Sequence, residues 1–149
     1  MMEQADLIAM LNELIATNRD SEEGYRTASE AVENADYRQI FLDSAQQRTE
    51  FIAILSDLVH QYGGDPEQSG HFSGTLQRAW INIKAALTQG DGPIMAECDL
   101  GEEAALALYA DTLPKNLPEE MKTVVRHQLS EIRIAHDRIH ALNGALAQT

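Results

Sequence analysis

The sequence predicts an all-α protein, a four-helix bundle with one long connection between its second and third long helices. Apolar residues recur every three or four positions along four long stretches, which is the spacing of one helix face. Turn residues separate these stretches, and no run alternates apolar with polar residues as a strand would. With 149 residues, the chain is expected to form a single domain, 1–149, with a core of its own.

The first two long helices are expected over residues 6–33 and 37–62. Asp36 suits the N-cap of the second helix, because Gln39 follows three residues later, as in a capping box. Gly63 suits the end of this helix, since glycine accepts the left-handed conformation that often terminates helices.

Three further helices are expected over residues 73–89, 93–113 and 118–145. The first of them is short and lies in the long connection, where Trp80 is expected to dock it on the bundle. Pro118 stands in the first turn of the last helix, where the missing N–H of proline costs nothing.

The length of the connection after residue 62 predicts the topology. A second helix of about 26 residues is about 39 Å long at 1.5 Å per residue. The residues from 63 to 90 include a helix and are numerous enough to return along that whole length. The third long helix would then run parallel to the second, which is the ferritin-like topology.

Composition excludes several classes of partner. The formal net charge is −13, so no basic surface is available to bind nucleic acid or an anionic membrane. A single cysteine, Cys98, excludes an internal disulfide and is expected to be a small buried residue. The N-terminal residues do not resemble a signal peptide and no run is apolar enough to span a membrane, so a cytoplasmic location is expected.

Polar residues interrupt the apolar stripes near the midpoints of all four long helices. These midpoints lie at nearly the same height, because each helix spans the same bundle. A polar layer is therefore expected inside the bundle. Its predicted members are Glu22, Tyr25, Arg48, Glu102, Tyr109 and Gln128.

This is the layer in which ferritin-like proteins hold two metal ions, using Glu residues and Glu-x-x-His pairs. The chain contains no Glu-x-x-His. Two Asp-x-x-His pairs, Asp57 with His60 and Asp137 with His140, are interpreted as exposed residues near helix ends. His136 and His140 are one helical turn apart but lack the sequence context that gives this spacing meaning. No metal or other cofactor is expected.

Arg48 supports this interpretation, because a permanently charged guanidinium on the inward stripe repels a divalent cation. A buried Arg48 would require an acidic partner, and Glu102 or Glu22 could supply it. The alternative is that Arg48 extends to the edge of the bundle and covers apolar surface.

Residues 85–114 contain six acids and no Lys or Arg. We interpret the acids as a solvated helix face. The alternatives are weak cation binding or a partner with a basic surface.

A family resemblance rests on residues spread along the chain. They are Asp20-x-x-x-Gly24-Tyr25, Arg48-x-x-Phe51, Gly63-Gly64-Asp65-Pro66-x-x-Ser69-Gly70, Arg78-Ala79-Trp80, Lys84-Ala85-Ala86-Leu87, Gly101-Glu102-Glu103, Tyr109, Gln128 and His136-Asp137. Over about residues 7–144 the chain resembles an uncharacterised bacterial family of ferritin-like four-helix-bundle proteins, a domain of unknown function. The resemblance implies that fold and no established activity, with at most a stress-related role. It makes Glu102 and His136, then Glu23, the first positions to inspect for a metal ligand.

Two functions are compatible with the polar layer and with the family resemblance. The first is a non-enzymatic bundle with an ion-pair layer, acting in a stress response or as an interaction module. The second is a metal-binding protein or oxidase that holds iron, manganese or zinc through Glu23, Glu102, Glu131 and His136. Arg48 and the missing Glu-x-x-His pairs favour the first. A homodimer is also expected, since such bundles often bury a helix face against a second copy.

Overall fold

The computed structural model describes residues 2–66 and 80–148, and within these two stretches every regular element is a helix. The four long helices are α1 (Gln4–Ala31), α2 (Ala35–Gln61), α5 (Asp91–Thr112) and α6 (Glu119–Ala147). A short helix, α4 (Ile83–Ala86), precedes α5. The predicted all-α class is confirmed for the described part of the chain.

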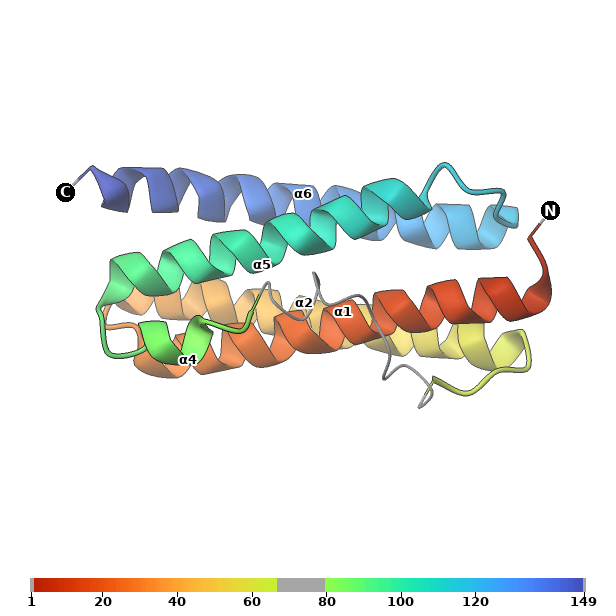
Figure 1. Ribbon diagram of the computed structural model, residues 1–149, viewed down its shortest axis with the longest axis horizontal. Coiled ribbons are helices and arrows are strands. Elements are labelled where there is room, and N and C mark those ends of the chain that lie inside the picture. The colour runs from red at the N-terminus through yellow and green to blue at the C-terminus, as the bar shows by residue number, and fades with distance from the viewer. Residues whose placement is uncertain (1, 67–79, 149) are drawn as a thin grey trace.

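The four long helices lie lengthwise beside one another (Figure 1). The α1 and α2 helices form one antiparallel pair, and α5 and α6 form another. Figure 1 shows α2 and α5 running in the same direction, which is the relative direction that the long connection predicts. Residues 67–79 of that connection, including the first part of the helix expected over 73–89, lie outside the described residues.

The N-cap of α2 is Asn34, so the expectation that Asp36 caps this helix is wrong. The Asn34 carboxamide oxygen accepts hydrogen bonds from the backbone N–H groups of Asp36 and Tyr37, at 2.8 and 3.1 Å. The helix therefore begins two residues earlier than expected. Asp36 lies in its first turn, where a negative charge still interacts favourably with the helix dipole.

The helix expected over 73–89 is much shorter in its described part, where only α4 is α-helical. Turns flank α4, and hydrogen bonds between residues three apart close them, from the Ile83 N–H to the Trp80 carbonyl and from the Leu87 N–H to the Lys84 carbonyl. Trp80 is anchored at one end, and the chain must enter α5 after Gly90, whose φ is 99°. Between these two points, one turn of α-helix, Ile83–Ala86, is flanked by turns.

Trp80 fixes this segment against two long helices. Its side chain is buried, and its ring meets the Tyr25 ring edge-on at 5.2 Å between centroids. A Cβ atom added at Gly24 of α1 or at Gly101 of α5 would approach the Trp80 ring to 2.2 or 2.1 Å. Both positions therefore require glycine, because any side chain would displace the indole.

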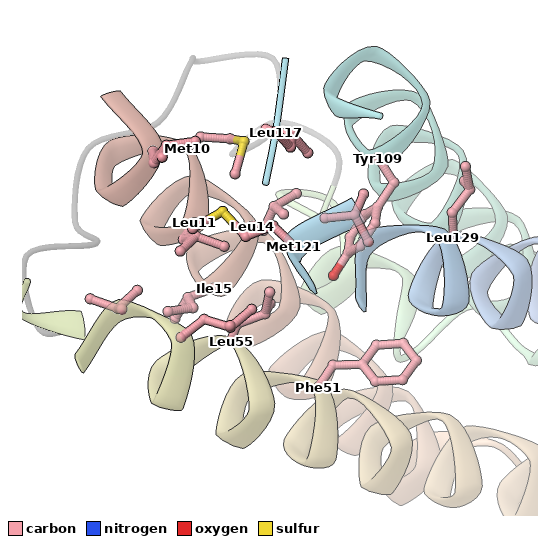
Figure 2. Packing of buried hydrophobic residues seen from close by; sticks show 14 of the residues in the cluster. Met10, Leu11, Leu14, Ile15, Phe51, Leu55, Tyr109, Leu117, Met121 and Leu129 are labelled. Atoms are coloured by element: carbon pink, nitrogen blue, oxygen red, sulfur yellow. The ribbon is translucent and has the colours of Figure 1, made fainter. Parts of the chain in front are cut away.

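Two hydrophobic clusters fill the interior. The first lies towards the N-terminal end of α1, and Figure 2 shows its side chains converging from all four long helices. The second lies towards the opposite end and includes Tyr25, Phe41, Trp80 and the buried Cys98. Polar residues occupy the boundary between the clusters, which is where the candidate site lies.

None of the described helices is both long enough and apolar enough to cross a membrane.

Candidate functional site

A layer of fully buried polar side chains lies between the two hydrophobic clusters. Its members with no exposed surface are Asn18, Ser21, Arg48, Glu102 and Gln128. In α1, α2 and α5 the apolar residues on one side of this layer belong to one cluster, and those on the other side belong to the second. Burying so many polar groups is costly unless they bond to one another. Their contacts therefore define what the layer can do.

Arg48 and Glu102 form an ion pair at the centre of this layer. The Arg48 Nη2 donates to the Glu102 Oε1, and both side chains have no exposed surface. The Arg48 Nε also donates to Gln47 at 3.2 Å, and its guanidinium carbon lies 5.7 Å from the centroid of the Tyr25 ring. A carboxylate and an aromatic face thus surround a permanent positive charge inside the protein.

A second set of bonds links three helices across the layer. The Asn18 side-chain amide of α1 donates to the Tyr109 hydroxyl at 2.7 Å. That hydroxyl in turn donates to the side-chain amide oxygen of Gln128, on α6, at 2.6 Å. Asn18 also donates to the Leu14 carbonyl at 2.8 Å. These bonds fix the relative heights of α1, α5 and α6.

Glu22, the other partner that the sequence allows for Arg48, lies at the edge of the layer. Its side chain is 29% exposed, accepts a hydrogen bond from the Thr49 hydroxyl and lies 3.9 Å from the Arg26 guanidinium. The buried charge of Arg48 is therefore matched by Glu102.

Burial governs the ionisation of the layer. It raises the pKa of the Glu102 carboxyl and lowers the pKa of Arg48 to about 10, so Arg48 stays charged at pH 7. Burial also raises the pKa of Tyr109, which keeps this hydroxyl protonated and able to donate. The layer offers a neutral hydroxyl, amides and one ion pair. These groups bond to one another across the interior of the bundle.

A second polar cluster lies between α5 and α6, and we call it the α5–α6 cluster. It consists of Asp99, Glu103, His136 and His140, and one ligand atom from each lies within 4.8 Å of the others. Among the described residues this is the only such group of three or more acids, histidines or cysteines. The His140 Nδ1 lies 2.9 Å from the Asp99 Oδ2, and the His136 Nε2 lies 3.4 Å from the Asp99 Oδ1.

Sequence reasoning missed this cluster. Asp99 is 5% exposed, so the interpretation of the whole acidic run as a solvated face is wrong at this position. The available signal was two pairs at one-turn spacing, Asp99 with Glu103 and His136 with His140, on helices expected to be neighbours. His140 is 63% exposed, as expected, but it also bonds to Asp99, and this hydrogen bond raises the pKa of the imidazole.

The four residues named from the sequence as possible metal ligands lie in separate places. Glu102 is paired with Arg48, and His136 belongs to the α5–α6 cluster. Glu23 lines a hollow of about 350 Å³ beside Trp80, and Glu131 lines another of about 190 Å³ between α2 and α6. As a set, these four do not form one binding site.

Asp20 shares the hollow of Glu23 and is a half-buried acid. Burial and the nearby negative charge of Glu23 raise its pKa from 3.8 to about 6. Its Oδ2 atom is buried and has no hydrogen-bond partner within the described stretches. Asp20 therefore carries a charge at pH 7 that the fold does little to stabilise.

The architecture and its buried layer define the class of protein, an all-helical bundle whose polar centre is filled by its own side chains. Residues 6–115 match the family described as a domain of unknown function, DUF2383, and the chain belongs to this family. The match covers α1 through α5 and ends before α6, so His136 and His140 lie beyond it. The chain has no match among curated proteins. The family description carries no activity.

Proposed function

We propose that this protein is a non-enzymatic, ferritin-like bundle in which an ion-pair layer stands where related folds hold a di-metal centre. The observation that supports the proposal is the fully buried pair of Arg48 and Glu102 at mid-height. The parallel direction of α2 and α5 in Figure 1 is compatible with the ferritin-like topology.

The side chains of this layer do not fit a di-metal centre. Such a centre needs several carboxylates and two histidines, whereas the fully buried side chains of this layer in the described part of the chain include one carboxylate, Glu102, and no histidine. That carboxylate already binds a guanidinium, whose charge repels a divalent cation. We therefore assign no chemical step to metal in the layer.

The layer has a clear structural use. Its ion pair joins α2 to α5, and the bonds of Tyr109 join α5 to α1 and α6. A shift of any of these helices by one turn would leave a buried charge or amide without its partner, which costs several kcal/mol. The layer thus favours one register of the bundle and suits a rigid protein that presents a defined surface to a partner.

Iron oxidation tests this proposal, since it is the reaction that a di-metal centre in this position would perform. Untagged protein should oxidise Fe²⁺ in air no faster than buffer does. The same assay on His136→Gln separates iron held at the α5–α6 cluster from iron in the layer. Saturable, catalytic oxidation by both proteins would contradict a non-enzymatic bundle with a filled centre.

We also propose that the protein forms a homodimer. Ile54 of α2 and Ile134 of α6 are large apolar side chains that are 43% and 58% exposed. Covering such residues with a second copy would remove apolar surface from water. Light scattering at high micromolar concentration should give the mass of two chains, and a mass of 16.5 kDa would contradict a dimer.

The resemblance alone supports a stress-related role and a bacterial source, and we propose both on that ground. We propose a cytoplasmic location on a different ground, because a single cysteine suits a reducing compartment. Protein abundance in host cells should rise under oxidative or starvation stress. Constant abundance under both stresses would contradict the role.

A further inference from the structure

We propose that the α5–α6 cluster is a mononuclear binding site for a divalent transition cation of the zinc type. The site lies between α5 and α6, on a different face of α5 from Glu102 and with different partners, so it goes beyond the proposed function and does not depend on it. Its four ligands are Asp99 and Glu103 from α5 with His136 and His140 from α6.

The backbone places these four side chains together. Asp99 and Glu103 are four residues apart on α5, and His136 and His140 are four residues apart on α6, so each pair lies on one face of its helix. The two helices are antiparallel neighbours (Figure 1), and the two pairs face each other. Each helix therefore offers two ligand atoms from adjacent turns.

The distances suit tetrahedral coordination. Bonds of about 2.0–2.1 Å to a tetrahedral zinc ion place neighbouring ligand atoms about 3.3 Å apart. The Asp99 Oδ2 lies 2.9 Å from the His140 Nδ1, and the Asp99 Oδ1 lies 3.4 Å from the His136 Nε2. The Glu103 Oε1 lies 3.8 Å from the same His136 nitrogen. Small side-chain rotations would bring all four ligand atoms to coordinating distance, because none is more than 4.8 Å from another.

A buried acceptor points into the site. Asp99 is 5% exposed, and its Oδ1 atom has no hydrogen-bond partner among the residues that the structure describes. This oxygen faces the His136 Nε2, which has no such partner either. A bound cation would satisfy both the Asp99 Oδ1 and the His136 Nε2.

Neighbouring groups orient the ligands. The Asn143 side-chain amide donates to the Asp99 Oδ2 at 2.9 Å, which fixes the carboxylate plane. The Asp137 carboxylate lies 3.5 Å from the His136 Nδ1, on the side of the ring away from Asp99. Carboxylates in that position commonly hold a ligating imidazole in one tautomer.

The ligand chemistry selects the class of cation. Two imidazoles and two carboxylates suit zinc and its first-row neighbours, while calcium and magnesium prefer oxygen ligands alone. Glu103 and His140 are 54% and 63% exposed, so a cation can enter from solvent. Once bound, it would connect α5 to α6 and offset the acidic charge of the segment around Asp99.

Calorimetric titration tests the site directly. Zinc chloride is titrated into untagged full-length protein that has been treated with chelator and dialysed. The expected result is one zinc ion per chain and a higher melting temperature, because a cation that binds only the folded state stabilises it. Magnesium chloride at the same concentrations should produce no heat of binding.

Variants locate the ion. His140→Gln removes a ligand that is mostly exposed, so the fold should be retained, and zinc binding should weaken by at least about 100-fold, since loss of outer partners alone costs 10–100-fold. His136→Gln should do the same. His60→Gln on α2 and His127→Gln on α6 are matched controls, because both histidines are exposed and lie outside the cluster. Their affinities should stay within about twofold of the parent.

Two results would overturn this proposal. One is a parent protein that binds no zinc at micromolar concentration. The other is zinc binding that His140→Gln and His136→Gln leave unchanged. Neither result affects the proposed function, which depends on Arg48 and Glu102 and is tested by iron oxidation.

Discussion

Two acids three residues apart on α5 have different partners. Glu102 is fully buried and paired with Arg48, whose charge is permanent at any physiological pH. Asp99 is nearly buried and faces two imidazoles, a side-chain type that can also bind metal. The same side-chain chemistry therefore serves a fixed structural pair in one direction and an exchangeable cation in the other.

The difference follows from helix geometry. A step of three residues turns the side chain by about 60° around the helix axis, so neighbouring faces of α5 point to different helices. Glu102 faces the arginine of α2, and Asp99 faces the histidines of α6. Gly101, between them in sequence, faces Trp80. One short stretch of α5 thus contacts three other segments.

The largest predicted effect is on the fixed pair. Arg48→Ala leaves the Glu102 carboxylate buried without its cation, and this should lower the free energy of unfolding by about 3–5 kcal/mol. Urea unfolding followed by circular dichroism measures the change. Arg26→Ala is the matched control, because its ion pair with Glu22 is exposed and should be worth less than about 1 kcal/mol. Equal effects of the two substitutions would contradict the difference between buried and exposed pairs.

A substitution at Gly101, which lies on α5 between the two acids, should have a smaller effect on the free energy of unfolding. Gly101→Ala places a methyl group 2.1 Å from the Trp80 ring, and such overpacking should cost about 1–3 kcal/mol. Emission from Trp80, the only tryptophan, should shift to longer wavelength as the indole is displaced.

Gly144→Ala is the control for this change, because nothing lies within 4 Å of the added methyl group on α6. It should stabilise the protein by about 0.5–1 kcal/mol, since alanine favours helix over glycine. An unshifted emission spectrum and unchanged stability for Gly101→Ala would mean that Trp80 does not pack there.

Asp20 extends the comparison to an acid beside a like charge. Its pKa of about 6 in the folded protein exceeds the ordinary aspartate value of 3.8, so the folded state binds more protons than the unfolded state between these values. The free energy of unfolding should therefore fall as pH rises from about 4 to about 7. The residue is partly exposed, so solvent screening should limit the fall to less than about 1 kcal/mol.

Asp20→Asn should remove this part of the pH dependence, which urea unfolding at several pH values measures. Asp57→Asn, at an exposed position on α2, is the control and should leave the profile unchanged. Identical profiles for the parent and Asp20→Asn would show that the carboxyl titrates normally.

The sequence predicts the helices well and the partners of the polar residues less well. The spacing of apolar residues locates the four long helices to within about two residues, because it reflects one buried face. The sequence does not identify the N-cap of α2 correctly, since the side chains of Asn34 and Asp36 are both chemically suitable for capping. It also overestimates the helix before α5, because the docking of Trp80 is a tertiary contact with α1 and α5.

For the polar residues too, the sequence predicts which side chains are buried better than it predicts their partners. Position on the inward stripe is enough to suggest that Arg48 needs an acid, and it leaves Glu22 and Glu102 as alternatives. The rotation of each helix decides between them, and this rotation depends on packing between helices. The α5–α6 cluster was missed for that reason, because Asp99 and His136 meet only when two helices are oriented against each other.

Arg48 and Glu102 neutralise each other inside the bundle, and a double-mutant cycle tests this pairing. The unfolding free energies of the parent, Arg48→Met, Glu102→Met and the double variant are compared. Each single substitution should destabilise by about 3–5 kcal/mol, while the double variant should recover most of that loss, because apolar side chains can replace a buried pair at little cost. Single effects that simply add, to within about 0.5 kcal/mol, would contradict the account.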